Sequence, residues 1–351
     1  MERLLAALLP LLPAALVARL AGPPIEIRGR RLDPHLTLAM KGAARRTPLH
    51  RMSAAEARVA TSAALALSLP RPRRMAEVDH RAVAGAAGPL RARLYRPPGI
   101  DSPRPLVLYF HQGGFVIGDL DWCEPFCTLL AETARCLVLS VDYRKGPSDR
   151  FPAAQEDAVA AYRWALSHAG EVGGDPRRIV VAGDSAGGGL AAHIAQAAKR
   201  AGLPQPLLQI LIYPWLHAYA DNASYRDFGA SEPLTRESML WFLANYARER
   251  DREDPRLSPL LEPDVTGLAP ALVVTAGFDV LCDEGEAYAK RLEAAGVPVT
   301  IRCEESLCHS FTSLGGISPA AARACQAIAC DLERTLTREA PVAANLLIAG
   351  E

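Results

Sequence analysis

Ser185 lies in the run GDSAGG, residues 183–188, which contains the G-x-S-x-G pattern of a serine nucleophile. In a chain of this composition the pattern arises by chance in roughly one case in eleven, so it needs support from its surroundings. A hydroxyl is a weak nucleophile and requires a base and an orienting acid. Asp279 and His309 follow downstream as candidates for these two roles. Together the three residues predict acyl transfer through a covalent acyl-enzyme.

Other residues compete for these roles, and their sequence context is weaker. A serine N-cap on an ordinary helix is the alternative interpretation of Ser185, but it leaves the flanking glycines unexplained. Asp283 and Glu286 are expected to cap the start of the next helix. His193 lies eight residues into the helix after Ser185, roughly 12 Å along its axis, and cannot reach back. The other histidines are expected on the surface or in the core.

The run HQGGF, residues 111–115, suits the third requirement of acyl transfer, a set of donors for the oxyanion. Glycines let backbone N–H groups approach a substrate without a Cβ in the way. Gly113, Gly114 and Ala186 are therefore the expected oxyanion donors. His111 is expected to fix the loop by hydrogen bonding rather than to take part in the reaction.

These residues need a scaffold, and the hydrophobic pattern predicts an α/β fold. Continuous apolar runs are typical of strands buried on both faces, and they occupy residues 106–110, 136–141, 179–182, 207–212 and 272–275. Helical stretches at 153–168, 186–200 and 284–295 alternate with them, and a short strand-like run follows at 299–302. The pattern predicts a mostly parallel sheet between helices. Ligands gather at the carboxyl ends of such strands, where Ser185, Asp279 and the 111–115 run are found.

Two further elements precede these strands. Residues 76–83 and 90–95 alternate around Gly85–Gly88 and predict an antiparallel hairpin. Before the Pro- and Arg-rich boundary at 69–74, Ser53 and Glu56 form a capping box that starts a helix running toward Leu67.

Composition excludes some classes of protein. Of the 351 residues 50% are hydrophobic and 22% charged, with a net charge of zero, which gives no case for nucleic acid as a partner. Residues 1–75 carry 13 basic and 4 acidic side chains. This basic segment could contact an anionic membrane, but we expect it to pack on the acidic remainder of the chain. The eight cysteines show no C-x-x-C spacing, so no metal site is expected, and reduced thiols favour the cytoplasm.

The two ends of the chain are apolar. Residues 1–20 fit neither a signal peptide nor a membrane span and predict an amphipathic or buried helix over an apolar pocket, with a peripheral membrane or lipid contact as the alternative. The tail 342–350 could dock on a second subunit, which leaves a homodimer open.

The motifs together resemble the bacterial hormone-sensitive-lipase-like esterases (family IV) of the α/β-hydrolase fold. The likeness runs from about residue 82 to about residue 336, through HQGGFVIGDLD (111–121), DYR (142–144), FPAA (151–154), GDSAGG, SPL (258–260) and AGFDVLCDEGEAYAKRLEAAG (276–296). It implies hydrolysis of short- to medium-chain acyl esters without a cofactor, on an eight-stranded sheet with helices on both faces. It also implies a helical cap made of residues 1–70 and an insertion at about 216–262 in a catalytic domain spanning 71–351.

The chain departs from the family pattern at three places. Gln112 replaces the first glycine of an HGGG loop, KGPS at 145–148 replaces the usual LAPE, and Ser310 replaces the glycine after the histidine. We expect the oxyanion donors to survive these changes, and loop shape or acyl preference to differ.

The substrate pocket and the exact reaction are less well defined by the sequence. Phe115, Trp215 and Phe228, with Trp241 and Phe242, are candidates for an apolar pocket. Amide, lactone or carbamate cleavage by the same three residues is an alternative to ester cleavage. A non-catalytic small-molecule receptor on this fold is a second alternative, against which the presence of His309 speaks.

Overall fold

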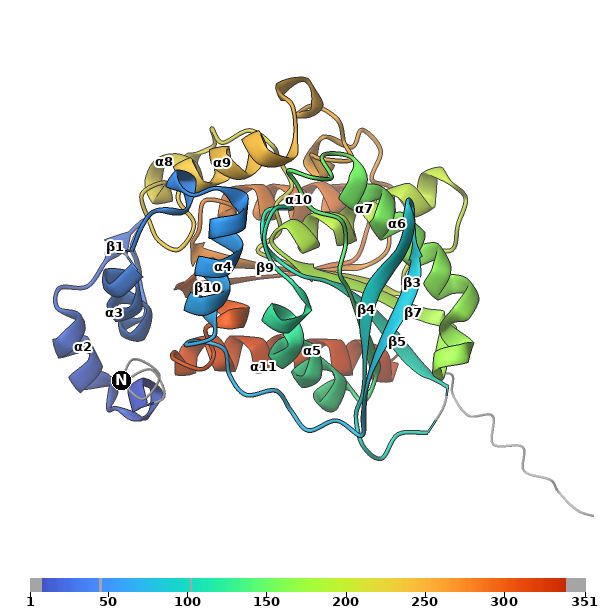
Figure 1. Ribbon diagram of the computed structural model, residues 1–351, viewed down its shortest axis with the longest axis horizontal. Helices are drawn as coiled ribbons and strands as arrows, with labels where there is room; N and C mark the ends of the chain where they lie inside the picture. The colour runs from blue at the N-terminus through green and yellow to red at the C-terminus, as the bar shows by residue number, and fades with distance from the viewer. Residues whose placement is uncertain (1–7, 44–45, 102, 339–351) are drawn as a thin grey trace, which may run out of the picture.

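An eight-stranded sheet forms the centre of the protein in the computed structural model, which describes residues 8–43, 46–101 and 103–338 (Figure 1). The sheet has the order β10-β9-β8-β7-β5-β6-β4-β3. Its strands are β3 (Glu77–Gly85), β4 (Gly88–Arg96), β5 (Arg104–Phe110), β6 (Leu137–Val141), β7 (Gly174–Asp184), β8 (Leu208–Ile212), β9 (Ala271–Phe278) and β10 (Val299–Cys308). The tail 342–350 and residues 1–7 lie outside the described residues.

The strand pairing follows from the hydrophobic pattern. All neighbours from β10 to β6 are parallel, whereas β3 pairs with β4 and β4 with β6 in antiparallel orientation. Every residue of β6, β8 and β9 is buried, as expected for strands covered on both faces. The predicted hairpin is β3–β4, and the predicted mostly parallel sheet is confirmed.

Helices cover both faces of this sheet. Helices α5 (Leu120–Ala134) and α11 (Pro319–Arg338) pack together on one face, and α6 (Ala153–His168), α7 (Ala186–Arg200) and α10 (Cys282–Ala294) lie on the other (Figure 1). The predicted N-cap of α10 is wrong: Leu281, not Asp283, occupies that position. The Leu281 N–H donates to the Asp279 carboxylate at 3.0 Å. The Asp283 carboxylate instead accepts from the Ser224 N–H and from Arg28.

The N-terminal segment and the 216–262 segment lie close together. They contain α2 (Ala14–Ala21), β1 (Glu26–Ile27), β2 (Arg30–Arg31), α3 (Pro34–Ala43), α4 (Ala54–Leu65), α8 (Ala223–Phe228) and α9 (Arg236–Tyr246). Short 3₁₀ turns complete the chain at Leu9–Leu11, Leu49–Arg51, Ala169–Val172, Glu249–Asp251, Pro259–Leu261 and Phe311–Ser313. Helix α4 begins at the predicted capping box of Ser53 and Glu56. The Trp241 Nε1–H of α9 donates to the Met52 carbonyl at 3.0 Å and joins the two segments.

The N-terminal segment is fastened to the acidic body by arginines. Arg28 binds Asp227 and Asp283 at 2.6 and 2.7 Å, and Arg30 lies 3.9 Å from Glu286. Just after β2, the Asp33 N–H donates to the Ser306 carbonyl of β10 at 2.9 Å, along the free edge of the sheet. The basic segment therefore packs on the body, which was one of the two interpretations of its charge.

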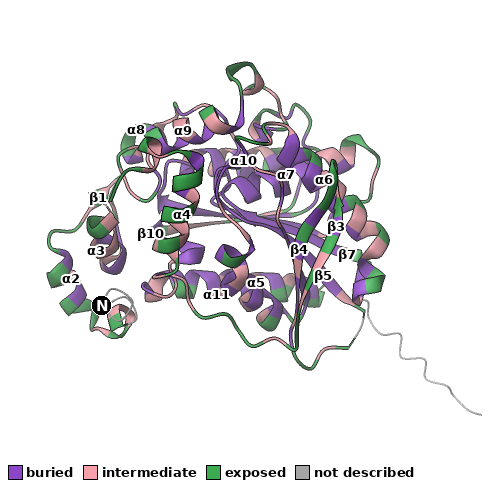
Figure 2. Cartoon of the chain, in the orientation of Figure 1, coloured by how far each residue is buried: buried purple, intermediate pink, exposed green. Residues whose placement is uncertain are grey.

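Helix α2 is amphipathic and lies at the periphery on α3 (Figure 1). It buries Val17 and Ala21, whereas Leu16 and Leu20, with Leu11 before it, are exposed (Figure 2). Within the described part of the chain, no helix combines the length and apolar character that crossing a bilayer requires.

Candidate active site

Ser185 lies in a sharp turn between the end of β7 and the start of α7. Its backbone has φ 56° and ψ −119°, a conformation that residues with a side chain rarely adopt. Although Ser185 occupies the N-cap position of α7, its side chain makes no capping hydrogen bond. Strain of this kind persists only where the surrounding structure enforces it, and it occurs mainly at functional sites. The hydroxyl is consequently available for a partner outside the helix.

The glycines that flank Ser185 are required by close packing. A Cβ on Gly183 would lie 2.3 Å from the backbone of Gly187, and a Cβ on Gly187 would lie 1.9 Å from the Phe110 carbonyl oxygen. Real Cβ contacts are not this short, so any side chain would push α7 away from β5 and β7. The G-x-S-x-G spacing therefore follows from the distance between the helix and the sheet.

The structure brings Ser185, His309 and Asp279 into one hydrogen-bonded chain. The His309 Nδ1–H donates to Asp279 Oδ2 at 2.7 Å, and His309 Nε2 lies 3.0 Å from Ser185 Oγ. Because a carboxylate only accepts, Nδ1 carries the proton and Nε2 is free to accept the serine proton. All three side chains are buried. Asp279 follows β9 and His309 follows β10, so each stands at the carboxyl end of its strand.

Gly113 and Gly114 lie in the loop after β5, the strand next to β7 in the sheet. Both have positive φ, 131° and 59°, and a Cβ on Gly113 would lie 2.1 Å from the Ile117 carbonyl. Among the hydrogen bonds of the described residues, none uses the N–H of either glycine. Ala186 is the first residue of α7, and the first N–H groups of a helix have no partner within it. All three N–H groups are thus available to an anionic oxygen.

Two of the departures from the family pattern meet in space. The Ser310 hydroxyl donates to Gln112 Oε1 at 2.5 Å, and Gln112 Nε2–H donates to Ser313 Oγ at 2.8 Å. The Gln112 side chain is buried. Gln112 precedes the glycine loop and Ser310 follows His309, so these bonds connect the loop of the expected oxyanion donors to the loop of the expected base.

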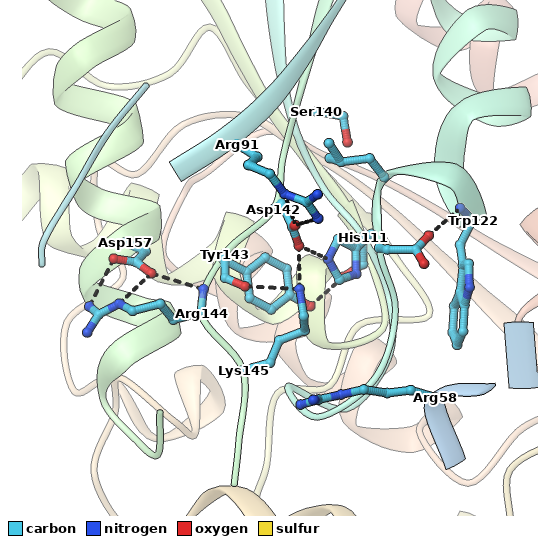
Figure 3. A network of polar contacts seen from close by, with 12 residues as sticks. Arg58, Arg91, His111, Trp122, Ser140, Asp142, Tyr143, Arg144, Lys145 and Asp157 are labelled. Atoms are coloured by element: carbon cyan, nitrogen blue, oxygen red, sulfur yellow. Dashed lines mark hydrogen bonds and ion pairs between the residues drawn. The ribbon is translucent and has the colours of Figure 1, made fainter. Parts of the chain in front are cut away.

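His111 lies behind the glycine loop in a charged network (Figure 3). Its Nδ1–H donates to the Gln112 carbonyl at 2.7 Å, and its ring stacks on Tyr143 at 4.4 Å. Its Nε2 lies 3.8 Å from Asp142, which also binds Lys145. Burial opposes ionisation of Asp142, but His111 and Lys145 hold the pKa of that carboxyl well below its usual range. The ammonium of Lys145, from the second departure KGPS, therefore fixes the turn beside His111.

Sequence reasoning missed a second connection between the Ser185 turn and the His309 loop. Asp184 Oδ2 accepts from the Tyr213 hydroxyl at 3.0 Å and from Thr312 Oγ1 at 2.9 Å. Burial raises the pKa of Asp184, which is enclosed completely. The Tyr213 ring also packs against His309, with centroids 4.7 Å apart. The available signal was position: Asp184 lies inside GDSAGG, and Tyr213 directly follows β8.

Of the aromatic residues expected in a pocket, Trp241 is partly exposed and the other four are buried. Phe115 lies between Trp215 and Tyr246, with ring centroids 5.3 and 4.6 Å away. The backbone N–H of Trp215 donates to the Ser185 carbonyl at 3.0 Å. Phe228 packs on Phe278 at 5.8 Å. The Phe242 ring lies close to Gly114, because a Cβ added to Gly114 would be 2.3 Å from the ring. Trp241 binds the N-terminal segment.

The histidine of α7 is separate from this site. His193 is buried among Arg200, Arg256 and Asp254, and burial, followed by the two arginines, lowers its pKa to about 3. Its ring nitrogen Nδ1 has no hydrogen-bond partner among the described residues. His193 is a neutral core histidine at physiological pH.

A model of the α/β hydrolase fold family matches residues 107–313. This match covers more than half of the chain, and the chain belongs to that family. The resemblance to esterases of this fold is confirmed by its relatives. The carboxylic ester hydrolase LipN of Mycobacterium tuberculosis is 42% identical over 304 residues, which are 84% of this chain and 80% of LipN. An ethyl acetate hydrolase of Pseudomonas putida is 38% identical over 80% of this chain and 90% of its own length.

Solved structures of α/β hydrolases and esterases also superpose on this chain. An α/β hydrolase enzyme from the metagenome of Lake Arreo, Spain, superposes with a TM-score of 0.84 at 38% identity and covers 87% of this chain and 99% of its own. A thermostable esterase from Pseudomonas putida has a TM-score of 0.83 at 34% identity, over 90% of this chain and 98% of the esterase.

Proposed function

We propose that this chain, a carboxylic ester hydrolase like its relatives, cleaves short- to medium-chain acyl esters with Ser185, His309 and Asp279 as its catalytic triad. The observation that carries the proposal is the contact of His309 Nε2 with Ser185 Oγ at 3.0 Å, while Nδ1–H binds Asp279 at 2.7 Å. The strained backbone of Ser185 supports it.

The reaction has two halves. Ser185 Oγ attacks the ester carbonyl as His309 Nε2 takes its proton, and Asp279 stabilises the imidazolium that forms. The N–H groups of Gly113, Gly114 and Ala186 bind the oxyanion, and removal of one such donor typically lowers the rate about 10²–10³-fold. His309 then gives its proton to the leaving alcohol, and an acyl-enzyme remains. Water attacks this intermediate with His309 again as base, and the acid is released.

Residues 1–70 and about 216–262 are proposed to form the cap over a small-molecule ester. The hydrogen bond from Trp241 to Met52 joins these two segments, and Phe242 lies against Gly114. Phe115, Trp215 and Phe228 are proposed to line the pocket, with Trp215 bound to the Ser185 backbone. A relative named for ethyl acetate supports a short acyl group. A lipid contact of the N-terminal helix and a homodimer stay predictions.

Replacement of the nucleophile tests the proposal. Ser185→Ala should remain folded by circular dichroism but lose p-nitrophenyl acetate turnover and covalent labelling by a phosphonate ester. Ser167→Ala is the control, because this exposed serine on α6 binds only the Arg163 carbonyl of its own helix. Near-normal turnover by Ser185→Ala would sink the assignment. Matched ester and amide substrates of equal acyl length test the class of bond, and faster cleavage of the amide would contradict ester hydrolysis as the main reaction.

A further inference from the structure

Two cysteines and their neighbours form a second cluster of reactive side chains. Cys282 is the first residue of α10, and Cys303 lies on the edge strand β10. Their Sγ atoms and a carboxylate oxygen of Glu286 all lie within 4.8 Å of one another. Cys282 is buried and Cys303 is partly exposed, so a small molecule can reach the pair from solvent.

The charge of the cluster decides which ligand or reaction it suits. Two thiols and a carboxylate could hold a soft metal ion, but Arg30 already supplies a cation. Its Nη1 lies 3.7 Å from Cys282 Sγ, and its Nη2 lies 3.9 Å from Glu286. A guanidinium cannot lose its charge and would repel a metal ion. The arrangement therefore favours a negative charge on sulfur.

The environment places that charge on Cys303. Thr275, its register partner on β9, is fully buried, and its hydroxyl has no hydrogen-bond partner among the described residues. The adjacent Cys282 thiol, and then the adjacent Thr275 hydroxyl, lower the pKa of Cys303 to about 7 against the effect of burial, and Arg30 adds to the lowering. The adjacent Cys303 sulfur, together with burial, raises the pKa of Cys282. A thiolate is therefore favoured on the partly exposed Cys303, with the buried Cys282 thiol beside it.

Four of the other six cysteines differ from this pair. Burial raises the pKa of Cys127, Cys136, Cys308 and Cys325, which keeps these thiols protonated and inert. Cys303 combines partial exposure with a lowered pKa, the two properties that make a cysteine sensitive to peroxide.

We propose that Cys282 and Cys303 form a redox-active dithiol that hydrogen peroxide converts to an intramolecular disulfide. The Cys303 thiolate attacks one oxygen of the peroxide, the O–O bond breaks and hydroxide leaves, which yields a sulfenic acid at Cys303. The Cys282 sulfur then attacks the Cys303 sulfur, the S–O bond breaks, and the hydroxyl leaves as water with the Cys282 proton. Peroxide gains two electrons, and the two sulfurs together lose two. The two Sγ atoms already lie within 4.8 Å of each other, so a short movement brings them to the disulfide bond length of about 2.05 Å.

Peptide mapping of the full-length protein tests the proposal. The reduced protein is treated with hydrogen peroxide, blocked with N-ethylmaleimide, digested and analysed by mass spectrometry without reduction. The expected product is a peptide pair joined through Cys282 and Cys303, which dithiothreitol cleaves. Eight blocked thiols after peroxide treatment and unfolding, or a bond between other cysteines, would overturn the proposal.

Single variants separate the two sulfurs. Cys282→Ser should accumulate a sulfenic acid at Cys303 that dimedone traps, whereas Cys303→Ser should give no dimedone adduct at Cys282. Cys330→Ser is the matched control, because Cys330 is also partly exposed, and it should still form the cross-link. At about pH 7 we expect Cys303 to react faster than Cys330, because Cys303 lies beside a second thiol and near the Arg30 guanidinium. Equal rates would contradict the proposed thiolate. Normal ester turnover of each variant before oxidation serves as the folding control.

Discussion

The hydroxyl of Ser310 donates a hydrogen bond of 2.5 Å to the side-chain oxygen of Gln112, 198 residues earlier in the chain. Each residue stands where the esterase pattern has glycine, and each adjoins a proposed functional element: Gln112 precedes the oxyanion loop, and Ser310 follows the base. The bond, continued from Gln112 to Ser313, holds these two loops at a fixed separation. A glycine pair could not make this connection.

We expect Gln112→Ala and Ser310→Ala each to lower kcat about 5-fold with little change in KM, because a hydrogen bond contributes about 1 kcal/mol. The double variant should lose little more than either single variant, since both changes remove the same bond. A double-mutant cycle on p-nitrophenyl ester turnover measures this coupling. Multiplicative effects of the two substitutions would show that the residues act independently.

Gly187→Ala should strongly destabilise the protein. Its new methyl group would lie 1.9 Å from the Phe110 carbonyl oxygen, so α7 must move and carry the turn at Ser185 with it. We expect a loss of at least about 3 kcal/mol in the free energy of unfolding, at the upper end of single substitutions. Urea unfolding measures it. Gly170→Ala is the control, because a Cβ there meets no atom within 4 Å, and an equal loss in both variants would refute the packing argument.

His193 should make the stability depend on pH. Its folded-state pKa of about 3 lies below the unfolded value of about 6.5. As the pH falls between these two values, His193 is protonated in the unfolded chain but stays neutral in the folded chain. The contribution of His193 to the free energy of unfolding is fully present above about pH 6.5 and is lost progressively toward pH 3. The loss is about 2 kcal/mol at about pH 5. The variant His193→Gln should lack this portion of the pH dependence. Unfolding curves at several pH values measure it, and identical profiles for both proteins would exclude His193 as the source.

Arg58→Ala should weaken the loop that carries the proposed oxyanion donors. From α4, the Arg58 guanidinium donates to the Val116 carbonyl at 2.9 Å and to the Gly146 carbonyl at 2.7 Å. We expect a loss of about 1–3 kcal/mol in stability, because two carbonyl groups lose a charged donor, and a lower kcat. Lysine should not rescue it, since an ammonium lacks the forked geometry. Arg51→Ala, an exposed arginine nearby, should behave like wild type. Full activity of Arg58→Lys would argue against a two-point contact.

The hydrophobic pattern was enough to predict the sheet, its hairpin and the helices α6, α7 and α10, whereas α5 and α11 were not predicted. Buried parallel strands consist of unbroken apolar runs. The tight turn at Ser185 requires glycine on both sides, and these glycines are visible in the sequence at 183 and 187. Asp279 could be proposed as the orienting acid because functional residues gather at the carboxyl ends of such strands.

The connections between loops could not be predicted in this way. Gln112 meets Ser310, and Asp184 meets Thr312, across more than a hundred residues of chain, and no local period records such pairs. The false N-cap at Asp283 has the same origin. A distant partner, Arg28, binds the carboxylate, and the helix begins after Leu281 without a side-chain cap. Local rules cannot anticipate side chains whose partners come from another part of the chain.

The hydrogen bond from the Asp33 N–H to the Ser306 carbonyl has a consequence for the behaviour of the protein in solution. An uncovered edge strand presents unpaired N–H and C=O groups that recruit strands from other molecules. Here β2 and the residues after it lie on β10 and occupy part of that edge. The N-terminal segment thus covers part of this edge against strand addition by other molecules, and we expect a deletion that includes Asp33 to expose it.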